Sequence, residues 1–311
     1  MRRMIATLLF AGTPLFALAA DLPDWAYPVT PPRGTLDNVV LKQVPGSTKQ
    51  YTQAQIDDGF NPPDWFPDQH PPMPPVVAHG KRPAARACAL CHLTNGAGHP
   101  ESSSLAGLNA QYFIRQMEEF KAKRRTGIRA AVMNEIAAAI SDEEVKAAAD
   151  YFAALKPTVI TKVVETDTVP KTYVGAGAMR FEVKGPDAGR EPIGSRIIVV
   201  PEDEPRAHMR DPHSGFIDYV PLGSIKKGEA LAKTGAGRTT PCVTCHGWTL
   251  KGLNEWPALA GRPPTYLVRQ LHDMQTGARS GPAMALMKPV VENLTMDDMI
   301  ALAAYLGSLT P

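Results

Sequence analysis

Long apolar runs are almost absent from this sequence. After residue 20, no window approaches the roughly 18 consecutive apolar residues that a membrane-spanning helix needs, so we expect no membrane span in the mature protein. An excess of positive charge is also missing. The formal net charge is only +2, which argues against nucleic-acid binding through a basic surface. What remains, 44% hydrophobic and 21% charged residues, is typical of a globular protein of about two domains.

The N-terminus has the pattern of an export signal. Its parts are a charged start at Arg2 and Arg3, an apolar stretch over 4–16, and a small-residue cleavage site that ends at Ala19 or Ala20. An uncleaved anchor fits less well, because the apolar stretch is short, interrupted and followed at once by Asp21. We therefore expect 1–20 to be removed as a signal peptide and the mature protein to be periplasmic. Without the two arginines of the signal, 31 cationic residues balance 31 acidic ones.

Cysteine is scarce, and all four cysteines lie in two copies of the motif C-x-x-C-H. An exported protein with four cysteines would ordinarily be expected to form two disulfides. The motif instead indicates covalently attached haem, because its thiols form thioethers with the haem vinyl groups while the adjacent imidazole binds the iron. The sequence therefore predicts two haem c groups. Their attachment residues would be Cys88, Cys91, Cys242 and Cys245, and their proximal iron ligands His92 and His246.

An internal repeat accompanies the two motifs. Residues 88–157 align with 242–311 at an offset of 154 without a gap, and 20 of the 70 aligned pairs are identical. Much of the chain therefore consists of two homologous halves. Each half is too small to bury a large core of its own, so a porphyrin would form much of its apolar centre.

The repeat also selects candidates for the second axial ligand of each iron. Methionine supplies a thioether ligand in many haem proteins of this kind, and the chain has 12 methionines. Met133 and Met287 each lie 41 residues after the histidine of their motif, so we expect both to bind iron. Met284 is a rival in the second half, but its repeat equivalent is Ala130, which cannot bind a metal.

Further segments of the second half extend the pattern. They are 257–261 with the sequence Pro-Ala-Leu-Ala-Gly, 266–271, Leu294 seven residues after Met287, and a closing helix that ends at 304–306. With these segments the chain resembles dihaem cytochromes of the cytochrome c4 type over about 81–157 and 223–311. The resemblance implies two class I cytochrome c folds that face each other, each with a His/Met haem, and electron transfer in the periplasm. It also implies that a backbone carbonyl near Pro257, or near Ser103 in the first half, accepts a hydrogen bond from the proximal histidine.

We expect a mainly α fold, with two tandem class I cytochrome c domains, a Pro-rich N-terminal extension, and an irregular, partly β insert between the domains. The expected division is a signal peptide at 1–20, the extension at 21–80, the first domain at 81–157, the insert at 158–222 and the second domain at 223–311. Apolar periodicity and capping patterns predict the helices, and β-branched runs between Pro and Gly predict the strands. Helices are expected at Ala110–Lys123, Ser224–Ala232 and Pro264–Thr276 and after the capping patterns at Thr52, Ser141 and Thr295, and strands at Val159–Val164, Arg180–Val183 and Ile197–Val200. Prolines upstream of Cys88 predict that the opening helix of the first half is shortened or replaced.

Two repeat-equivalent arginines, Arg125 and Arg279, precede the candidate methionines. Each is followed by a hydroxyl residue and a glycine. A guanidinium at this place could bind a haem propionate through two parallel hydrogen bonds, or it could be a solvated loop cation. The spacing does not decide between these two readings.

The ligand pattern favours an electron carrier over an enzyme. Two His/Met irons have no open coordination site, and no fifth cysteine is present for a thiolate-ligated haem. We expect transfer between a donor dehydrogenase or quinol oxidase and a terminal acceptor, through transient docking with redox proteins. Two alternatives stay open. One is a cytochrome subunit of a periplasmic dehydrogenase complex, and the other is a dihaem enzyme, such as a peroxidase or a thiosulfate dehydrogenase, with one open haem.

Overall fold

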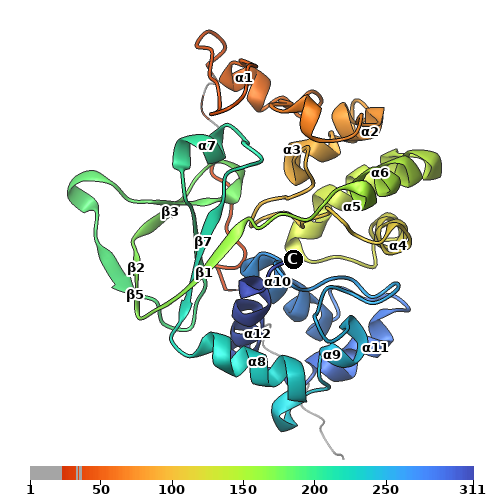
Figure 1. Ribbon diagram of the computed structural model, residues 1–311, viewed down its shortest axis with the longest axis vertical. Helices are drawn as coiled ribbons and strands as arrows, with labels where there is room; N and C mark the ends of the chain where they lie inside the picture. The colour runs from red at the N-terminus through yellow and green to blue at the C-terminus, as the bar shows by residue number, and fades with distance from the viewer. Residues whose placement is uncertain (1–22, 33, 35–36) are drawn as a thin grey trace, which may run out of the picture.

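The computed structural model describes residues 23–311, except 33 and 35–36. Two helical domains that follow the repeat lie beside a β-rich insert, with the N-terminal extension running along them (Figure 1). The expected signal peptide at 1–20 lies outside the described residues. Within the described part of the chain, no helix is long and apolar enough to cross a membrane.

The first domain consists of a short opening helix and four further helices. They are α2 Pro75–Ala78, α3 Cys88–His92, α4 Ala110–Lys121, α5 Ala131–Ala139 and α6 Asp142–Ala154, with a 3-10 turn at Ile128–Ala130. As the apolar spacing predicted, α4 buries Phe113, Met117 and Phe120, and it packs against both α5 and α6. The predicted capping box opens α6, where the side chains of Ser141 and Glu144 each accept a hydrogen bond from the other's backbone N–H. The opening helix is shortened to 4 residues, as the prolines predicted.

The second domain has the corresponding helices, and its opening helix has full length. They are α8 Ser224–Thr234, α9 Val243–His246, α10 Pro264–Gln275, α11 Met284–Val291 and α12 Met296–Ser308, with a 3-10 turn at Gly235–Gly237. Thr295 and Asp298 form the predicted capping box at the start of α12. α12 is almost entirely buried between α8 and α10. Gly228 permits the close crossing of α8 and α12, since a Cβ there would lie 1.9 Å from the carbonyl oxygen of Ala301.

The insert is a small β unit with seven strands among the described residues. They are β1 Thr161–Thr166, β2 Thr168–Pro170, β3 Thr172–Val174, β4 Arg180–Glu182, β5 Arg190–Pro192, β6 Ile198–Pro201 and β7 Phe216–Pro221, with helix α7 Glu204–His208 and 3-10 turns at Ala176–Ala178 and Gly185–Asp187. In the largest sheet, β7 is the central strand, parallel to β1 and antiparallel to β6. β2 pairs with β5, and β3 with β4. The partly β character of the insert is confirmed, and β1, β4 and β6 correspond to the three expected strands.

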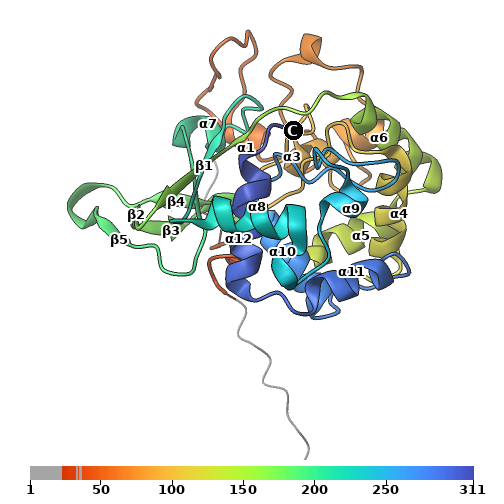
Figure 2. The same ribbon diagram turned by 60° about the horizontal axis from the view of Figure 1, so that its bottom comes forward.

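The largest sheet belongs to the body of the second domain. Val200, Phe216 and Val220 share one buried apolar cluster with Leu231 of α8 and Met299 of α12. The β2–β5 pair projects to the side away from the two helical domains in both views (Figure 2), whereas β4 packs against β6. The insert is therefore anchored on the second domain along one sheet.

The N-terminal extension contacts several parts of the molecule. It includes the predicted short helix α1 Gln53–Ile56, capped by Thr52, and a 3-10 turn at Pro67–Gln69. Trp25 and Tyr27 are buried in the apolar cluster of the second domain. Trp65 lies in a separate small cluster, against which Met209 of the insert packs. The extension thus connects elements that are far apart in the sequence.

Candidate haem-binding sites

The two C-x-x-C-H motifs form the short helices α3 and α9, and a backbone carbonyl holds the histidine of each. Nδ1 of His92 lies 2.8 Å from the carbonyl oxygen of Ser103, and Nδ1 of His246 lies 2.8 Å from that of Pro257. Nδ1 is therefore the donor, and Nε2 keeps the lone pair that an iron ligand needs. The carbonyl contact that the sequence resemblance implied is confirmed in both halves. Ser103 serves as well as Pro257 because the acceptor is main chain.

The thiols and imidazoles of the motifs lie in low-polarity surroundings. Burial raises the pKa of the Cys88 thiol to about 12 and that of the Cys242 thiol to about 11. Burial also lowers the pKa of both His92 and His246, against the opposing effect of their carbonyl partners. These side chains are therefore neutral near pH 7, as suits the wall of an apolar haem site.

A large cavity lies beside α9 in the second domain. It has a volume of about 1310 Å³, part of which is open to solvent. Cys242, Cys245 and His246 line this cavity together with Met287 and Met284. Much of the remaining wall is aliphatic and includes Leu259, Leu267, Leu271, Leu302 and Leu306. A space of this kind, with two thiols, an imidazole and a thioether in its wall, fits a haem c.

The first domain contributes to the wall of the same cavity, which the sequence did not lead us to expect. The contributing residues are Ser103, Leu108, Tyr112, Arg115 and Gln116. The repeat contains a signal that could have identified three of them. Tyr112, Arg115 and Gln116 are identical to Tyr266, Arg269 and Gln270 of the second half. The cavity therefore extends to the interface between the two domains.

Arg125 and Arg279 meet at this interface, and both are buried. The reading of these residues as solvated loop cations is therefore wrong. Arg125 donates hydrogen bonds to Oε1 of Gln116 at 3.2 Å and of Gln270 at 2.7 Å. Arg279 donates to the same two atoms, at 2.8 Å and 2.9 Å, and to the hydroxyl of Tyr112 at 3.0 Å. An antiparallel backbone bridge between the two arginines fixes this arrangement.

The buried guanidiniums create a strongly positive interface. Within the described residues, their hydrogen-bonded partners are neutral amides and hydroxyls. Burial and the nearby charge of Arg279 lower the pKa of Arg125 to about 10. Burial alone would raise the pKa of Tyr266, but the guanidiniums of Arg125, Arg279 and Arg262 outweigh it and lower this pKa to about 8. Such a donor set fits the carboxylates of haem propionates.

The candidate ligand of the first domain, Met133, lies on α5. It is half-buried and packs against the apolar core of the first domain, as does Cys88. The ring of His92 lies edge-on to that of Phe152 in the same core, with ring centroids 6.4 Å apart. The structure therefore places three of the four candidate residues of the first haem, Cys88, His92 and Met133, around one apolar centre.

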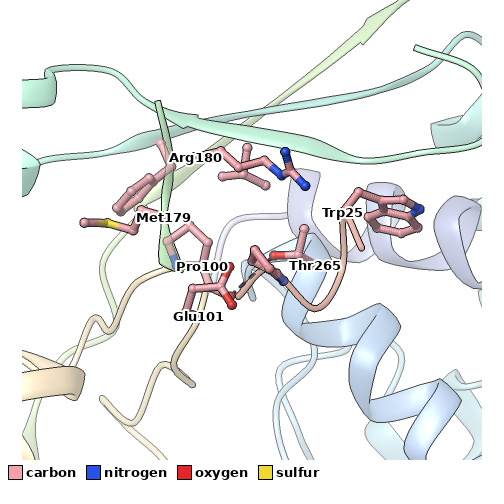
Figure 3. A pocket seen from close by; sticks show the side chains of 9 residues that line it. Trp25, Pro100, Glu101, Met179, Arg180 and Thr265 are labelled. Carbon is pink, nitrogen blue, oxygen red and sulfur yellow. Dashed lines mark hydrogen bonds between the residues drawn. The ribbon is translucent and has the colours of Figure 1, made fainter. Parts of the chain in front are cut away.

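A second and much smaller cavity, of about 290 Å³, lies where the extension, the insert and both domains meet. Figure 3 shows its wall, formed by Trp25 of the extension, Pro100 and Glu101 of the first domain, Met179 and Arg180 of the insert, and Thr265 at the start of α10. The Oε2 atom of Glu101 lies 3.4 Å from the guanidiniums of both Arg129 and Arg269. Arg269 also donates a hydrogen bond to the carbonyl of Ala26 at 2.9 Å. This cluster joins four parts of the chain and contains no haem-attachment residue.

Two domains, each with a haem-attachment helix and a histidine held by a carbonyl, define a dihaem c-type cytochrome. Comparison with protein families agrees with this class. Residues 225–310 match the family described as cytochrome c, and residues 75–152 match the family described as cytochrome c oxidase, cbb3-type, subunit III. Each match therefore covers one domain of the chain. The protein has two covalently bound haem c groups and a mainly α fold, and its resemblance to the cytochrome c4 type is confirmed.

Curated relatives match either most of this chain or a single part of it. The thiosulfate dehydrogenase electron acceptor of Stutzerimonas stutzeri is 26% identical over 233 residues, which cover 74% of this chain and 82% of the relative. Cytochrome c4 of Pseudomonas aeruginosa is 24% identical over 239 residues, covering 75% and 88%. Cytochrome c-554(548) of Halomonas halodenitrificans is 37% identical over 82 residues, which are 26% of this chain and 96% of the relative.

One solved structure has a similar fold. Thiosulfate dehydrogenase (TsdBA) from Marichromatium purpuratum, in its as-isolated form, superposes with a TM-score of 0.50 and 28% sequence identity over 73% of this chain. The superposed part is 37% of that longer chain. The likeness therefore concerns little more than a third of the solved protein.

Proposed function

We propose that this protein is a periplasmic electron carrier that takes electrons from a donor dehydrogenase or quinol oxidase and passes them to a terminal acceptor. One observation carries this proposal: His246 and Met287 line the same apolar cavity. The chain can therefore fill both axial positions of the second iron and leave no open site for a substrate. The equal spacing in the repeat assigns the same two roles to His92 and Met133.

The other site residues support this assignment. Cys88, Cys91, Cys242 and Cys245 would bind the two haems covalently, and each haem, held by His and Met, would store one electron as its iron changes between ferric and ferrous. Arg125 and Arg279 would hold propionates at the domain interface, since both guanidiniums are buried there and their hydrogen-bond acceptors among the described residues are neutral. Bound carboxylates would balance this buried positive charge.

The most specific donor that the comparisons support is a thiosulfate-oxidising dehydrogenase. Relatives from Stutzerimonas stutzeri and Thiomonas intermedia, 26% and 27% identical to this chain, are both named thiosulfate dehydrogenase electron acceptor. Similarity to the solved thiosulfate dehydrogenase favours one second candidate, in which this chain is itself the enzyme or a subunit fixed to it. The carrier and the enzyme differ in whether thiosulfate alone can reduce the protein.

Reduction by thiosulfate tests the two candidates directly. The exported holoprotein should carry two haems by intact mass, begin near residue 20, and stay oxidised when thiosulfate alone is added. A catalytic amount of a thiosulfate dehydrogenase should then reduce it fully. Reduction by thiosulfate alone, or stoichiometric binding of carbon monoxide to one ferrous haem, would contradict the carrier function and favour the enzyme function. Co-purification with a dehydrogenase at a fixed ratio would instead indicate a subunit.

A further inference from the structure

The two haem-attachment helices differ in how far they are covered by the rest of the protein. Leu90 lies between the two cysteines of the first motif and is 4% exposed. Its repeat equivalent, Thr244, is exposed. Just before the first motif, Ala87 is 2% exposed, whereas its equivalent Pro241 is half-buried. These two positions are therefore less accessible in the first domain than in the second.

Two segments from outside the cytochrome fold cover the first attachment helix. We call them the cap, which comprises 56–60 of the extension and 210–213 of the insert. The carbonyl of Gly59 accepts a hydrogen bond from the backbone N–H of Ala87 at 2.9 Å, and the carbonyl of Pro212 accepts one from the side chain of Asn95 at 2.9 Å. The cap therefore contacts the chain on both sides of the first motif.

Arg210 joins the cap to the first motif. Its guanidinium donates to the carbonyl of Leu90 at 2.9 Å, to the carbonyl of Ile56 at 3.1 Å and to the carboxylate of Asp57 at 2.9 Å. The side chains of Arg210 and Asp57 are both largely buried in this ion pair. A single side chain of the insert thus holds the extension against the first attachment helix.

The corresponding surface of the second domain is open. Leu286 is 61% exposed and at the same time lines the large cavity, and Thr240 is likewise exposed and part of the cavity wall. With Thr244 these residues form what we call the open rim. All three side chains are uncharged. The exposed carboxylate of Glu255 also lines the cavity, but it forms an ion pair with Arg115 at 2.6 Å.

We propose that the open rim of the second domain is the surface on which redox partner proteins dock, while the cap covers the attachment helix of the first domain. This inference rests on the proposed carrier function. The partner it fits is an electron-transfer protein whose cofactor edge is itself surrounded by uncharged side chains, because a charged partner surface would lose hydration against this rim without gaining an opposite charge. Such contacts are small and dissociate quickly.

The repeat supplies a matched pair of variants for the test. Leu286 and Val132 occupy equivalent positions, each one residue before its candidate iron ligand, and both are exposed. Leu286→Glu and Val132→Glu therefore add the same charge at the same place in the two domains. The probe is azurin, a small blue-copper protein. One electron passes from a ferrous iron of this protein to Cu(II) of azurin, which leaves ferric iron and Cu(I).

We expect Leu286→Glu to lower the second-order rate constant of this oxidation about tenfold, because the new charge loses hydration at the docking surface. Val132→Glu should change it less than about twofold. Independently of electron transfer, zinc-substituted azurin should shift the amide resonances of Thr240, Thr244 and Leu286, and leave those of Gly59 and Leu90 unchanged. Equal effects of the two variants, or shifts centred on the cap, would overturn the proposal.

Two further outcomes are separable from these. If a second copy of this chain occupied the rim, analytical ultracentrifugation would show a dimer that Leu286→Glu dissociates. This result would count against the proposal, because the rim would then bind another copy and not a redox partner. Binding of carbon monoxide by the wild-type holoprotein would overturn the carrier function instead. With two low-spin haems present and no difference between the variants, only the docking proposal fails.

Discussion

Arg125 and Arg279 occupy the same position in the two halves of the repeat and face each other across the domain interface through an antiparallel backbone bridge. The neighbouring hydrogen bonds are also related by the repeat. Thr126 donates its backbone N–H to the carbonyl of Ala278 at 2.6 Å, and Ser280 donates to that of Arg124 at 2.7 Å. A local two-fold axis therefore passes between the arginines. The two domains meet through equivalent residues, so one duplicated sequence supplies both sides of the positive interface.

Removal of one of these charges should change a haem potential. Arg279 lines the cavity of the second domain, and a buried cation stabilises ferrous haem over ferric haem, because the ferrous form carries one positive charge less. We expect Arg279→Gln to lower the reduction potential of the second haem by an amount on the order of tens of millivolts, with a smaller effect on the first. Spectroelectrochemical titration of both haems measures the two shifts.

Arg279→Lys is the matched control for this variant. It keeps the charge but loses the planar guanidinium that contacts two glutamines and a tyrosine. Its potential should stay nearer to wild type than that of Arg279→Gln. If both variants lower the potential equally, the effect comes from lost packing and the electrostatic account is wrong.

Carbon monoxide should distinguish the two iron sites. Met133→Ala should open only the first haem, and Met287→Ala only the second, with one equivalent of carbon monoxide bound by the ferrous protein in each case. Met284→Ala is the control. Met284 lines the same cavity as Met287 but has Ala130 as its repeat equivalent, so its loss should leave the spectrum of the ferrous protein unchanged. Carbon monoxide bound after loss of Met284, and refused after loss of Met287, would reverse the ligand assignment.

The features that could be predicted from the sequence are those that local chemistry or the repeat determines. The attachment residues follow from a contiguous motif, and the helices capped by Ser141 and Thr295 follow from capping residues three positions apart. The carbonyl contacts of His92 and His246 span only 11 residues. Contacts between residues this close in the sequence do not depend on how distant parts of the chain pack.

Contacts between distant segments could not be predicted in the same way. Arg210 and Asp57 are 153 residues apart, and nothing in their local sequence indicates that they pair. Burial of Arg125 depends on how the two halves pack, which the spacing of residues within one half does not contain. The central strand β7 escaped prediction because Asp218 places a carboxyl group at a fully buried position of an otherwise apolar pattern.

Asp218 should make the stability of the protein depend on pH. Burial raises its pKa to about 7, against the opposing hydrogen bond from the hydroxyl of Thr161, and its Oδ1 has no hydrogen-bond partner within the described structure. Below about pH 3 the carboxyl is protonated in both folded and unfolded chains, so it does not make the free energy of unfolding depend on pH there. As the pH rises towards 7 the unfolded chain loses this proton while the folded chain keeps it, and the free energy of unfolding falls by up to roughly 4 kcal/mol.

Asp218→Asn should remove this dependence. The amide cannot ionise and can still accept the hydrogen bond from Thr161, so the variant should gain stability over wild type between about pH 3 and 7 and equal it at lower pH. Urea unfolding at several pH values measures the difference. Asp167→Asn, at an exposed position of the same insert, should follow the wild-type curve. A variant less stable than wild type at pH 7 would show that the charged carboxylate is stabilised by a contact other than that with Thr161.

Docking over an uncharged rim should be only weakly sensitive to salt. Thr240, Thr244 and Leu286 carry no charge, and the chain without its signal is formally neutral, so long-range attraction adds little to the encounter with azurin. Between about 20 and 200 mM salt, we expect the rate constant of azurin reduction to change less than about threefold. Thr244→Lys places one charge at an exposed position of the rim and should steepen the salt dependence, whereas Tyr173→Lys, at an exposed position of the insert, should not. Stopped-flow measurements across this range decide the matter, and a steep dependence in the wild-type protein would mean that partners are steered to a charged surface elsewhere on the molecule.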